Sequence, residues 1–359
     1  MSEVKIMLGN EAIARGAFEA GVKVSAAYPG TPSTEISENI VKYPEIYAEW
    51  SPNEKVAMEV AIGASISGVR AMASMKHVGV NVASDPLYTI SYSGVNGGLV
   101  LVAADDPGLY SSQNEQDTRC VARAAMVPVL EPSDSQEAKD FMKYAFDLSE
   151  KYDTPIILRT TTRLSHSQGP VTLEERCEPV DAVYERNPAK YVMMPGNAKL
   201  RHVYVEKRMA EMAQWAESCE IKKTEYYNKK RGFICAGTTY NYAREAFGED
   251  ASYLKLGMVN PLPIEIIKEF AKNIHAVFPE IEEVWCVARR LERLEALKSE
   301  VTDVKIVPVP ADITNAGDTK AGFDRGKSEN AEITLIKPLF CLLIILFKYL
   351  SLFIIYIPP

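Results

Sequence analysis

The sequence has few of the residues that most often bind metals. Its 359 residues include only six cysteines and four histidines. The cysteines are scattered without a C-x-x-C pair, and no H-E-x-x-H occurs, so the sequence does not predict a cysteine-ligated or histidine-rich metal centre. Isolated cysteines without paired spacing are typical of a reducing compartment.

Other common catalytic and nucleotide-binding motifs are also missing. The sequence contains no G-x-x-x-x-G-K-S/T and no G-x-S-x-G, and no G-x-G-x-x-G follows its first expected strand. These absences argue against the phosphate-binding loop of nucleoside triphosphatases, the nucleophile elbow of hydrolases and the usual dinucleotide-binding turn.

Basic residues are outnumbered by acidic ones. Lys and Arg total 40 against 48 Asp and Glu, which gives a formal net charge of -8. Because nucleic-acid-binding proteins normally present a basic face to the phosphate backbone, nucleic acid is not expected as a partner. The first residues contain no apolar run of signal-peptide length, which favours a cytoplasmic location.

The length of the chain favours two domains with connecting material. Apolar runs alternate with helical patterns through residues 1–167, which predicts an α/β fold with a doubly wound parallel sheet. The clearest expected strands of this first domain lie at 22–28, 71–75, 97–104, 127–132 and 154–162.

The rest of the chain is expected to form three parts. Residues 168–230 are predicted to be a linker with one polar helix, and residues 231–310 a second, smaller α/β domain. Residues 311–359 are expected to be an irregular polar segment followed by an apolar tail. Within the second domain we expect strands at 232–236, 253–259 and 284–288, and helices at 240–247, 264–271 and, heavily charged and solvated, 289–300.

The apolar run at 339–357 permits two interpretations. It is about long enough to cross a bilayer, which would make it a membrane anchor. Alternatively, it is an out-of-frame or truncated extension, because the sequence before it is Gly-rich, polar and without periodicity. We favour the second interpretation.

The most informative stretch is Trp50–Arg70, in which a charged turn leads into a helix of small residues. Glu54 is expected to begin this helix. The small side chains that follow would allow a backbone or a flat ligand to approach closely. Glu59 lies five residues further on, about 140° around the helix, so only one of the two carboxylates can face a common site.

Polar clusters follow the carboxyl ends of expected strands at Tyr28–Ser33, Trp50–Glu54 and Ser111–Arg119. Open parallel sheets bind ligands at this edge, so the clusters are predicted to outline one cleft. Within the first cluster, a turn leading into a helix suits a carboxylate or a phosphate.

Individual polar residues of this edge are also compatible with structural roles. Thr31 could be only a turn hydroxyl, His77 a hydrogen-bonded loop residue and Arg119 a surface ion pair. Their coincidence at one edge of the sheet favours a functional role.

Four segments of the sequence resemble a known family. In chain order they read Y-P-G-T-P-S-T-E-I, W-S-P-N-E-K-V-A-M-E-V-A-I-G-A-S, M-K-H-V-G-V-N-V-A-S-D-P-L and S-S-Q-N-E-Q-D. They are similar to the alpha subunits of indolepyruvate ferredoxin oxidoreductases, which belong to the thiamine-diphosphate-dependent 2-oxoacid:ferredoxin oxidoreductases. The resemblance covers residues 4–163 and, less strongly, 231–284. It implies a thiamine-diphosphate pyrimidine-binding fold followed by a transketolase-C-terminal-like domain.

The resemblance implies an activity and partners. Enzymes of this type oxidatively decarboxylate arylpyruvates to aryl-acetyl-CoA and reduce ferredoxin, with thiamine diphosphate as the cofactor. The implied partners are the beta subunit of the oxidoreductase, ferredoxin, CoA and the arylpyruvate. The chain would dimerise through its pyrimidine-binding domain.

The resemblance also implies roles for individual residues. Glu54 would hydrogen-bond the aminopyrimidine ring of thiamine diphosphate and favour its imino tautomer, which requires its carboxyl group within reach of a ring nitrogen. Thr31 would contact the keto-acid end of the substrate, and the planar guanidinium of Arg119 would pair with its carboxylate. Further candidates for cofactor binding are His77, Asn81, Asn114 and Asp117.

Two features of the full-length family are absent from the sequence. One is the G-D-G…N signature that holds Mg2+ and the diphosphate, and the other is the set of cysteine runs that bind [4Fe-4S] clusters. Because the resemblance fades near Val284, we expect a C-terminally truncated chain. Two alternatives remain open: a catalytically incompetent fragment or interaction module that needs a partner chain, and a tail-anchored protein that uses the fold for binding.

Overall fold

The computed structural model describes residues 3–179, 181–227 and 232–277, together with four later strands. The chain divides into two compact units. Unit 1 comprises Met1–Ile221 and Gly257–Pro263, and unit 2 comprises Lys222–Leu256 and Ile264–Pro359.

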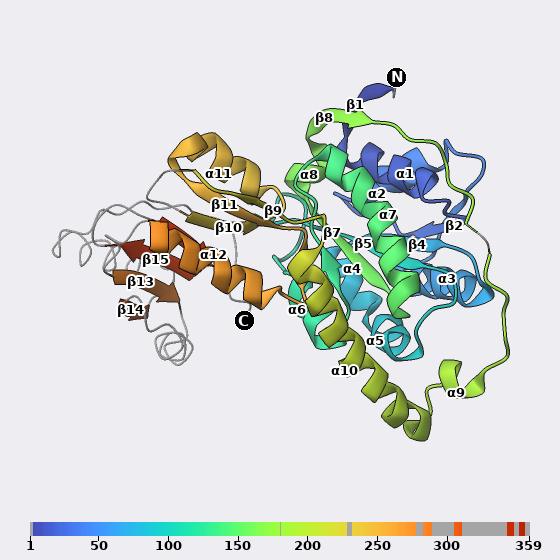
Figure 1. Cartoon of the computed structure of the whole chain (residues 1–359). Coiled ribbons are helices and arrows are strands. Elements are labelled where there is room, and N and C mark those ends of the chain that lie inside the picture. Colours follow the sequence, from blue (N-terminus) through green and yellow to red (C-terminus); the bar gives the residue numbers. More distant parts are fainter. Residues whose placement is uncertain are drawn as a thin grey trace. The chain divides into compact units, whose positions relative to one another are not determined.

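Unit 1 is built around a seven-stranded sheet with the order β12-β6-β7-β5-β4-β2-β3. Figure 1 labels four of these strands, β7, β5, β4 and β2. Neighbouring strands are parallel except β12, which runs antiparallel to β6. Every residue of β5 is buried, as expected for the central strand of a sheet covered on both faces. The strands are β2 Val24–Ala27, β3 Tyr47–Trp50, β4 Ala71–Lys76, β5 Leu99–Asp105, β6 Val129–Leu130, β7 Ile156–Thr161 and β12 Met258–Asn260.

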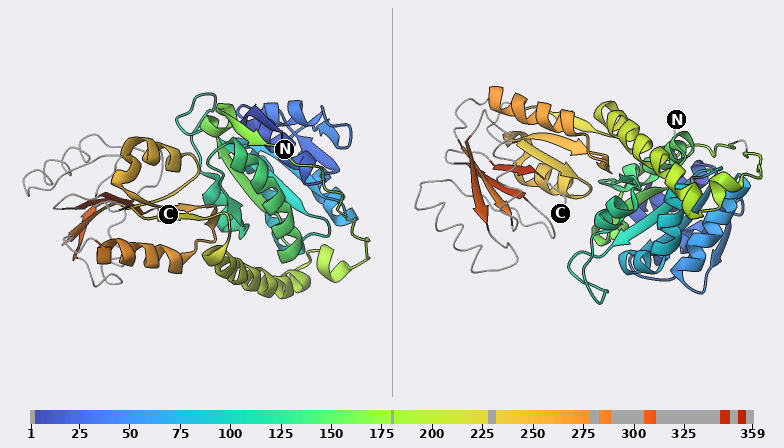
Figure 2. Two further views of the ribbon diagram at one scale, coloured as in Figure 1. Left: turned by 45° about the horizontal axis from the view of Figure 1, so that its top comes forward. Right: turned by 90° about the horizontal axis from the view of Figure 1, so that it is seen from below.

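Helices cover both faces of this sheet (Figures 1 and 2). On one face, α1 (Gly9–Glu19), α2 (Thr34–Ile40) and α7 (Ser135–Tyr152) share an apolar core with alternate strand residues such as Val100 and Leu158. The other face packs against a second set of helices, α3 (Glu54–Ser67), α4 (His77–Val82) and α5 (Ser84–Ser93). This arrangement confirms the predicted doubly wound α/β fold.

The remaining elements of unit 1 lie at its ends and edges. β1 (Val4–Leu8) and β8 (Gln168–Thr172) form a separate antiparallel pair. Four further helices complete the unit, namely α6 (Thr118–Ala125), α8 (Thr162–His166), α9 (Pro188–Tyr191) and α10 (Pro195–Ser218).

Unit 2 contains a mixed seven-stranded sheet with the order β14-β13-β15-β16-β10-β11-β9. Tyr253 lies in its core, where its ring stacks on Phe233 with 5.7 Å between centroids. The strands are β9 Lys223–Glu225, β10 Gly232–Ala236, β11 Ser252–Leu256, β13 Glu283–Ala288, β14 Lys305–Pro310, β15 Leu343–Phe347 and β16 Leu352–Ile355. The helices among its described residues are α11 Thr239–Phe247, a 3-10 turn at Gly248–Asp250 and α12 Ile264–Val277.

Most strands and helices lie where the sequence predicted them, but the strand expected at 253–259 is wrong. It is two strands, β11 and β12, which belong to different sheets. Gly257 separates them, and a Cβ atom there would lie 2.3 Å from the backbone oxygen of Ile221. A glycine is needed because the two backbones touch at this point.

The division into units differs from the predicted domain boundaries. The segment expected to be a linker does contain a helix, α10, but residues up to Ile221 belong to unit 1. Val205 and Met212 of α10 are fully buried, so this helix is part of the packed unit. The sequence did not reveal this because the apolar residues of the helix do not share one face: Leu200 and Val203 are exposed, whereas Val205 and Met212 are buried.

The C-terminal part of the chain also differs from expectation. The apolar tail, for which no strand was predicted, contains β15 and β16, which pair antiparallel with each other. The isoleucine and phenylalanine residues of this tail favour strands. The charged helix expected at 289–300 lies outside the described residues.

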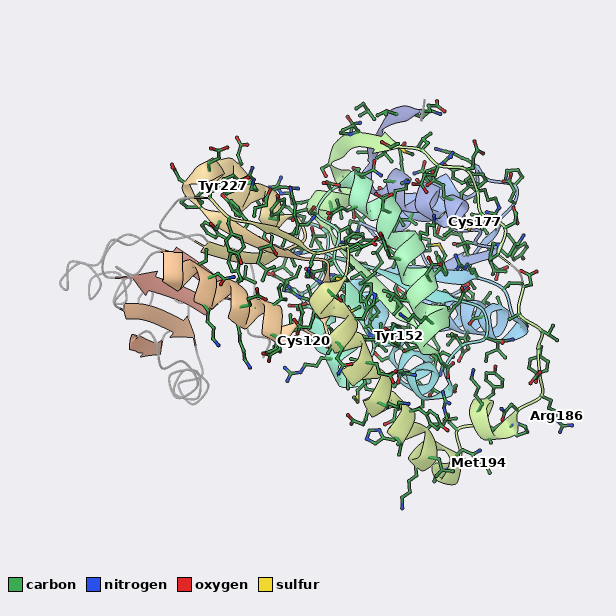
Figure 3. The ribbon with its side chains drawn as sticks, in the orientation of Figure 1. Cys120, Tyr152, Cys177, Arg186, Met194 and Tyr227 are labelled. Carbon is green, nitrogen blue, oxygen red and sulfur yellow. The ribbon has the colours of Figure 1, made fainter. Side chains whose placement is uncertain are left out.

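Two further findings concern the described residues alone. None of their helices combines the length and the apolar character that crossing a bilayer requires. No disulfide joins the cysteines among them, of which Cys120 is exposed on α6 and Cys177 is half-buried beyond β8 (Figure 3).

Candidate active site

The carboxyl ends of four neighbouring parallel strands meet at one edge of the unit 1 sheet. β3, β2, β4 and β5 end at Trp50, Ala27, Lys76 and Asp105. The three polar clusters predicted from the sequence follow three of these strands: one starts at Tyr28 directly after β2, one at the last residue of β3, and one at Ser111 in the loop after β5. Sheets of this type bind ligands at such an edge.

Glu54 is held at the first turn of α3. The side chain of Asn53 caps the helix by accepting a hydrogen bond of 3.0 Å from Val56 N. Glu54 is only 9% exposed, whereas Glu59 of the same helix is exposed. The helical period had predicted that only one of these carboxylates could point inward, and that one is Glu54.

The carboxyl group of Glu54 rests on the backbone of α4. A Cβ atom at Gly79 would lie 2.6 Å from Glu54 Oε1 and 2.9 Å from its Cδ. No real side chain can occupy that space without moving the carboxyl group. Sequence reasoning missed Gly79, although a glycine between two valines in the K-H-V-G-V-N segment was a signal for such a close approach.

His77 begins α4 and is 1% exposed. Its Nε2 lies 3.0 Å from the backbone oxygen of Asn114. Its Nδ1 is buried without a hydrogen-bond partner among the described residues. Because a carbonyl oxygen can only accept, Nε2 carries the proton, and in the neutral ring Nδ1 is then an acceptor with no donor.

The other asparagine of the predicted set lies apart from this contact. Asn81 is exposed on α4, and the side chain of Asn114 accepts a hydrogen bond of 2.7 Å from Gln116. The structure therefore places His77 and Asn114 in contact, while Asn81 points to the surface.

The loop that follows β5 closes against the turn that follows β2. Ser111 Oγ donates to Thr31 O at 3.3 Å, and Lys76 Nζ donates to Ser111 O at 3.0 Å. Asp106 holds the loop by accepting from Ser111 N at 2.8 Å and from Ser112 Oγ at 2.7 Å. Burial alone would raise the pKa of Asp106, but these hydrogen bonds lower it below its usual value. Thr31 itself is exposed beside the loop.

Arg119 and Asp117 are paired with each other. Arg119 donates to both oxygens of Asp117, with Nε at 2.8 Å from Oδ1 and Nη2 at 2.7 Å from Oδ2. Nη1 of Arg119 also lies 3.6 Å from Glu131 Oε1. The sequence alone had not indicated this pairing.

The pair belongs to a buried network of five charged groups. Arg159 donates to Asp105 at 2.7 Å and to Glu131 at a shorter distance. Burial alone would raise the pKa of Asp117, but the positive charges of Arg159 and Arg119 hold it well below its usual value. Glu131, Asp105 and Arg159 were missed because their buried positions carry no local sequence signal. No group of His, Cys, Asp or Glu within the described ranges is arranged to hold a metal ion.

Residues 15–231 match the family model described as pyruvate flavodoxin/ferredoxin oxidoreductase, thiamine diphosphate-binding. The indolepyruvate oxidoreductase subunit IorA of Archaeoglobus fulgidus is 47% identical over 297 residues, covering 79% of this chain and 47% of that protein. The subunit of the same name from Methanothermobacter marburgensis is 44% identical over 309 residues, covering 84% and 50%. The chain thus spans about half the length of these curated relatives.

One solved structure also has this fold. It is the 2-oxoglutarate:ferredoxin oxidoreductase from Magnetococcus marinus, with a TM-score of 0.63 at 17% identity. The similarity covers 91% of this chain and 65% of that one, and at this identity it concerns the fold alone.

Proposed function

This chain belongs to the pyruvate flavodoxin/ferredoxin oxidoreductase family, and from that membership we propose that it is the pyrimidine-binding part of an arylpyruvate oxidoreductase. The reaction proposed is oxidative decarboxylation of an arylpyruvate to an aryl-acetyl-CoA with reduction of ferredoxin. The choice of arylpyruvates rests on the relatives from Archaeoglobus fulgidus and Methanothermobacter marburgensis, which are named indolepyruvate oxidoreductase subunits.

The observation that carries this proposal is the buried carboxyl group of Glu54 against Gly79. The family model that the chain matches is a thiamine-diphosphate-binding domain, and two features of the structure fit such a cofactor. Glu54 is a largely buried carboxyl group at a helix start, and His77 Nδ1 is a buried acceptor without a partner in the described part of the chain. When bound, thiamine diphosphate supplies the electron sink for decarboxylation.

The protein's part in the proposed chemistry is to hold a proton and to orient the reactants. The Glu54 carboxyl would share a proton with a ring nitrogen of the cofactor, which a group fixed by Asn53 and Gly79 can do without rearrangement. His77 would provide a second polar contact. Asn81 and Asn114 remain predicted cofactor contacts at the same edge.

The substrate end of the site is proposed to include Thr31, which is exposed beside the loop after β5. For Asp117 and Arg119, the roles implied by the family resemblance remain predictions. Their side chains already form an ion pair with each other, so a ligand would have to compete for it.

Other parts of the proposed enzyme would come from outside this sequence. It contains neither the G-D-G signature for Mg2+ and the diphosphate nor the cysteine runs for [4Fe-4S] clusters. We therefore propose that these groups are supplied elsewhere in a complex that includes a beta subunit and accepts CoA and ferredoxin. A dimer contact through unit 1 belongs to the same proposal.

The test is Glu54→Gln in the complex reconstituted with its partner subunits. We expect turnover of indolepyruvate, followed by ferredoxin reduction, to fall by about 100-fold or more, because general acid–base groups contribute that much. Glu59→Gln is the matched control, since it makes the same change on the exposed face of α3. Full activity of Glu54→Gln would remove Glu54 from the mechanism.

The half-length match to the relatives favours one other candidate function. The chain alone would then be an interaction module that is catalytically incompetent without its partners. Titration calorimetry of the isolated chain with thiamine diphosphate and Mg2+ separates the two. Binding of the cofactor by the isolated chain would contradict the incompetent module.

A further inference from the structure

We propose that Lys76 is the cation that binds the carboxylate of the substrate, the role that the family resemblance implies for Arg119. The inference rests on the proposed function only for the identity of the acid. Its structural basis is that the side chain of Lys76 lies between the turn after β2 and the loop after β5.

Arg119 has little capacity left for a further anion. Its Nε and Nη2 donate to the two oxygens of Asp117, and its Nη1 lies 3.6 Å from Glu131. Its side chain is only 15% exposed. A substrate carboxylate would have to displace Asp117 from a buried pair, and breaking such a pair leaves an uncompensated charge.

Lys76 is in the opposite situation. Its Nζ donates to the backbone oxygen of Ser111 at 3.0 Å, and no carboxylate within the described ranges forms an ion pair with it. An ammonium group has three N–H donors, so two remain for a ligand. A neutral carbonyl does not cancel the positive charge, and hydrogen bonds between charged groups are the strong ones.

The turn after β2 leaves space for the lysine side chain. A Cβ atom at Gly30 would lie 2.9 Å from Cδ and 3.2 Å from Cγ of Lys76. Because Gly30 has no side chain, the lysine stem lies against the turn that contains Thr31. The ammonium group is thereby held beside the residue proposed to contact the keto-acid end.

The position of Lys76 also suits the geometry of a 2-oxoacid. Lys76 ends β4 and α4 begins at the next residue, so Gly79, which supports the Glu54 carboxyl, follows three positions later. One strand–helix junction thus holds both the cation and the support of the proposed proton-holding group. In a 2-oxoacid the carboxylate is bonded directly to the reacting carbonyl carbon, so its cation must lie close to the reaction centre.

Two other cations follow strands or begin helices on this edge. Lys55 is paired with Asp85 at 2.8 Å. Arg163 is exposed on α8, after β7, and is the rival that the experiment must distinguish from Lys76.

The experiment measures kcat and KM for indolepyruvate in the reconstituted complex with Lys76→Met. We expect KM to rise about 10- to 100-fold, the worth of one charge-assisted hydrogen bond, while kcat changes less. Lys76→Arg, which keeps the charge, should recover part of this loss. Equilibrium binding of indolelactate, which has the carboxylate but no keto group, should weaken by a similar factor in titration calorimetry.

Lys42→Met and Arg163→Gln complete the set. Lys42 precedes β3 and so lies at the amino ends of the strands, away from the proposed site. Lys42→Met should therefore leave KM unchanged. If Arg163→Gln raises KM and Lys76→Met does not, the assignment to Lys76 is wrong.

A double-mutant cycle with Gly30→Ala independently tests the contact between Gly30 and the stem of Lys76. The added methyl group displaces the lysine stem, so Gly30→Ala alone should raise KM by several-fold. In the Lys76→Met background the same change should have almost no effect on KM, because the displaced side chain no longer carries the ammonium group that binds the substrate. Equal effects in the two backgrounds would show that Gly30 does not act through Lys76.

Failure of the proposed function is distinguishable from failure of this inference. If the wild-type complex turns over 2-oxoglutarate or pyruvate but no arylpyruvate, the proposed substrate is wrong, and the same KM comparison with the accepted acid decides the role of Lys76. If the wild-type complex turns over arylpyruvate with an unchanged KM in Lys76→Met, only the inference fails. If the wild-type complex neither binds nor turns over any of these acids, both fail.

Discussion

Gly79 and Glu54 are in contact where no methyl group could fit. The Cβ atom of any other residue at position 79 would stand 2.6 Å from Glu54 Oε1. Because the carboxyl group ends a flexible side chain, it can move away, and the fold would survive such a substitution. The position of the carboxyl group would not survive it.

We therefore expect Gly79→Ala to lower turnover by about 100-fold, since a misplacement of about 1 Å at a reactive group costs that much. The melting temperature should fall little, because alanine is the better helix former by about 1 kcal/mol. Gly196→Ala is the control, as Gly196 lies in α10 with no atom within 4 Å of the added Cβ. Unchanged turnover in Gly79→Ala would show that Glu54 is not fixed by this contact.

At the scale of elements, the buried charges tie together four pieces of unit 1. Asp105 ends β5, Asp117 caps α6, Glu131 follows β6 and Arg159 lies in β7. The three carboxylates of this network lie against two guanidinium groups, those of Arg159 and Arg119. The network positions the start of α6 relative to the sheet and so holds the end of the loop that contacts Thr31.

Asp117→Asn tests the charge in this network while keeping the cap. Asparagine caps a helix as well as aspartate does, so the change removes mainly the ion pairs. At pH 7 we expect a loss of about 2–3 kcal/mol in the free energy of unfolding, measured with urea. Asp134→Asn, at the exposed cap of α7, should change it by less than about 0.5 kcal/mol.

The stability of the wild type and that of Asp117→Asn should respond differently to acid. Because the folded-state pKa of Asp117 lies well below its unfolded value of about 4, its stabilisation is complete above that pH and is lost as the pH falls below it. The free energy of unfolding of Asp117→Asn should therefore decline less steeply than that of the wild type below pH 4. Parallel curves would mean that the aspartate is not held ionised by Arg159 and Arg119.

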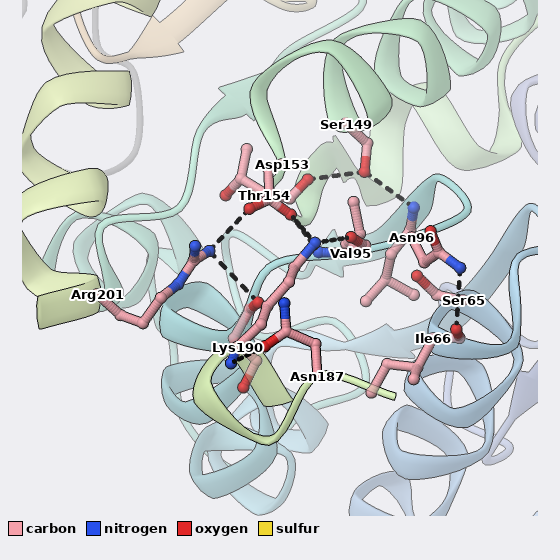
Figure 4. Close-up of polar contacts among 12 residues, drawn as sticks. Ser65, Ile66, Val95, Asn96, Ser149, Asp153, Thr154, Asn187, Lys190 and Arg201 are labelled. Atoms are coloured by element: carbon pink, nitrogen blue, oxygen red, sulfur yellow. Dashed lines mark hydrogen bonds and ion pairs between the residues drawn. The ribbon is translucent and has the colours of Figure 1, made fainter. Parts of the chain in front are cut away.

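At the scale of the whole molecule, one carboxylate holds α9 and α10 against the sheet part of unit 1. Asp153, which follows α7, lies 2.9 Å from Lys190 Nζ and 2.7 Å from Arg201 Nη2 (Figure 4). It also accepts from Val95 N at 2.8 Å. The buried guanidinium of Arg208 continues the attachment by donating to the backbone oxygens of Asp153 and Ser91.

Burial lowers the pKa of Arg208 to about 10, against the opposing charge of Asp153. Burying a guanidinium costs free energy unless it is hydrogen-bonded. The hydrogen bonds of Arg208 to two carbonyl oxygens offset this cost and hold α10 against the sheet domain. These contacts explain why the compact unit extends to Ile221, well beyond the last strand of its sheet.

Asp153→Asn should loosen this attachment. Asparagine tolerates the left-handed backbone of this position, where φ is 52°, so the change tests the charge alone. We expect about 1 kcal/mol less stability, a value reduced by solvent because the side chain is 38% exposed, and faster proteolysis between residues 181 and 194. Asp85→Asn, which removes an exposed ion pair with Lys55, should change neither. Equal proteolysis of both variants would contradict a role for Asp153 in holding α10.

Local patterns were sufficient to predict most of the fold. Strands such as Leu99–Asp105 are recognisable because they are buried on both faces and therefore continuously apolar. The start of α3 was predictable from the chain itself, because capping and helical period are set within a few residues. The period also showed that only one of Glu54 and Glu59 could face the site, and the resemblance to the family indicated Glu54.

Contacts between distant residues were not predictable in this way. Asp153 is far in the sequence from Lys190, and Glu54 is far from Gly79. The sequence around each of these residues does not predict which residue it contacts. Arg119 shows the consequence most clearly. The family motif indicated a cation for the substrate, but whether that cation is already neutralised depends on which carboxylates fold against it.

The sequence by itself therefore determined the family, the order of strands and helices and the carboxylate that faces inward, because each depends on residues close together in the chain. Only the tertiary structure decided that Gly79 supports Glu54, that Arg119 forms an ion pair with Asp117 and that α10 belongs to the sheet domain. These depend on surfaces brought together by folding, where burial and charge are set by neighbours that the local sequence does not contain.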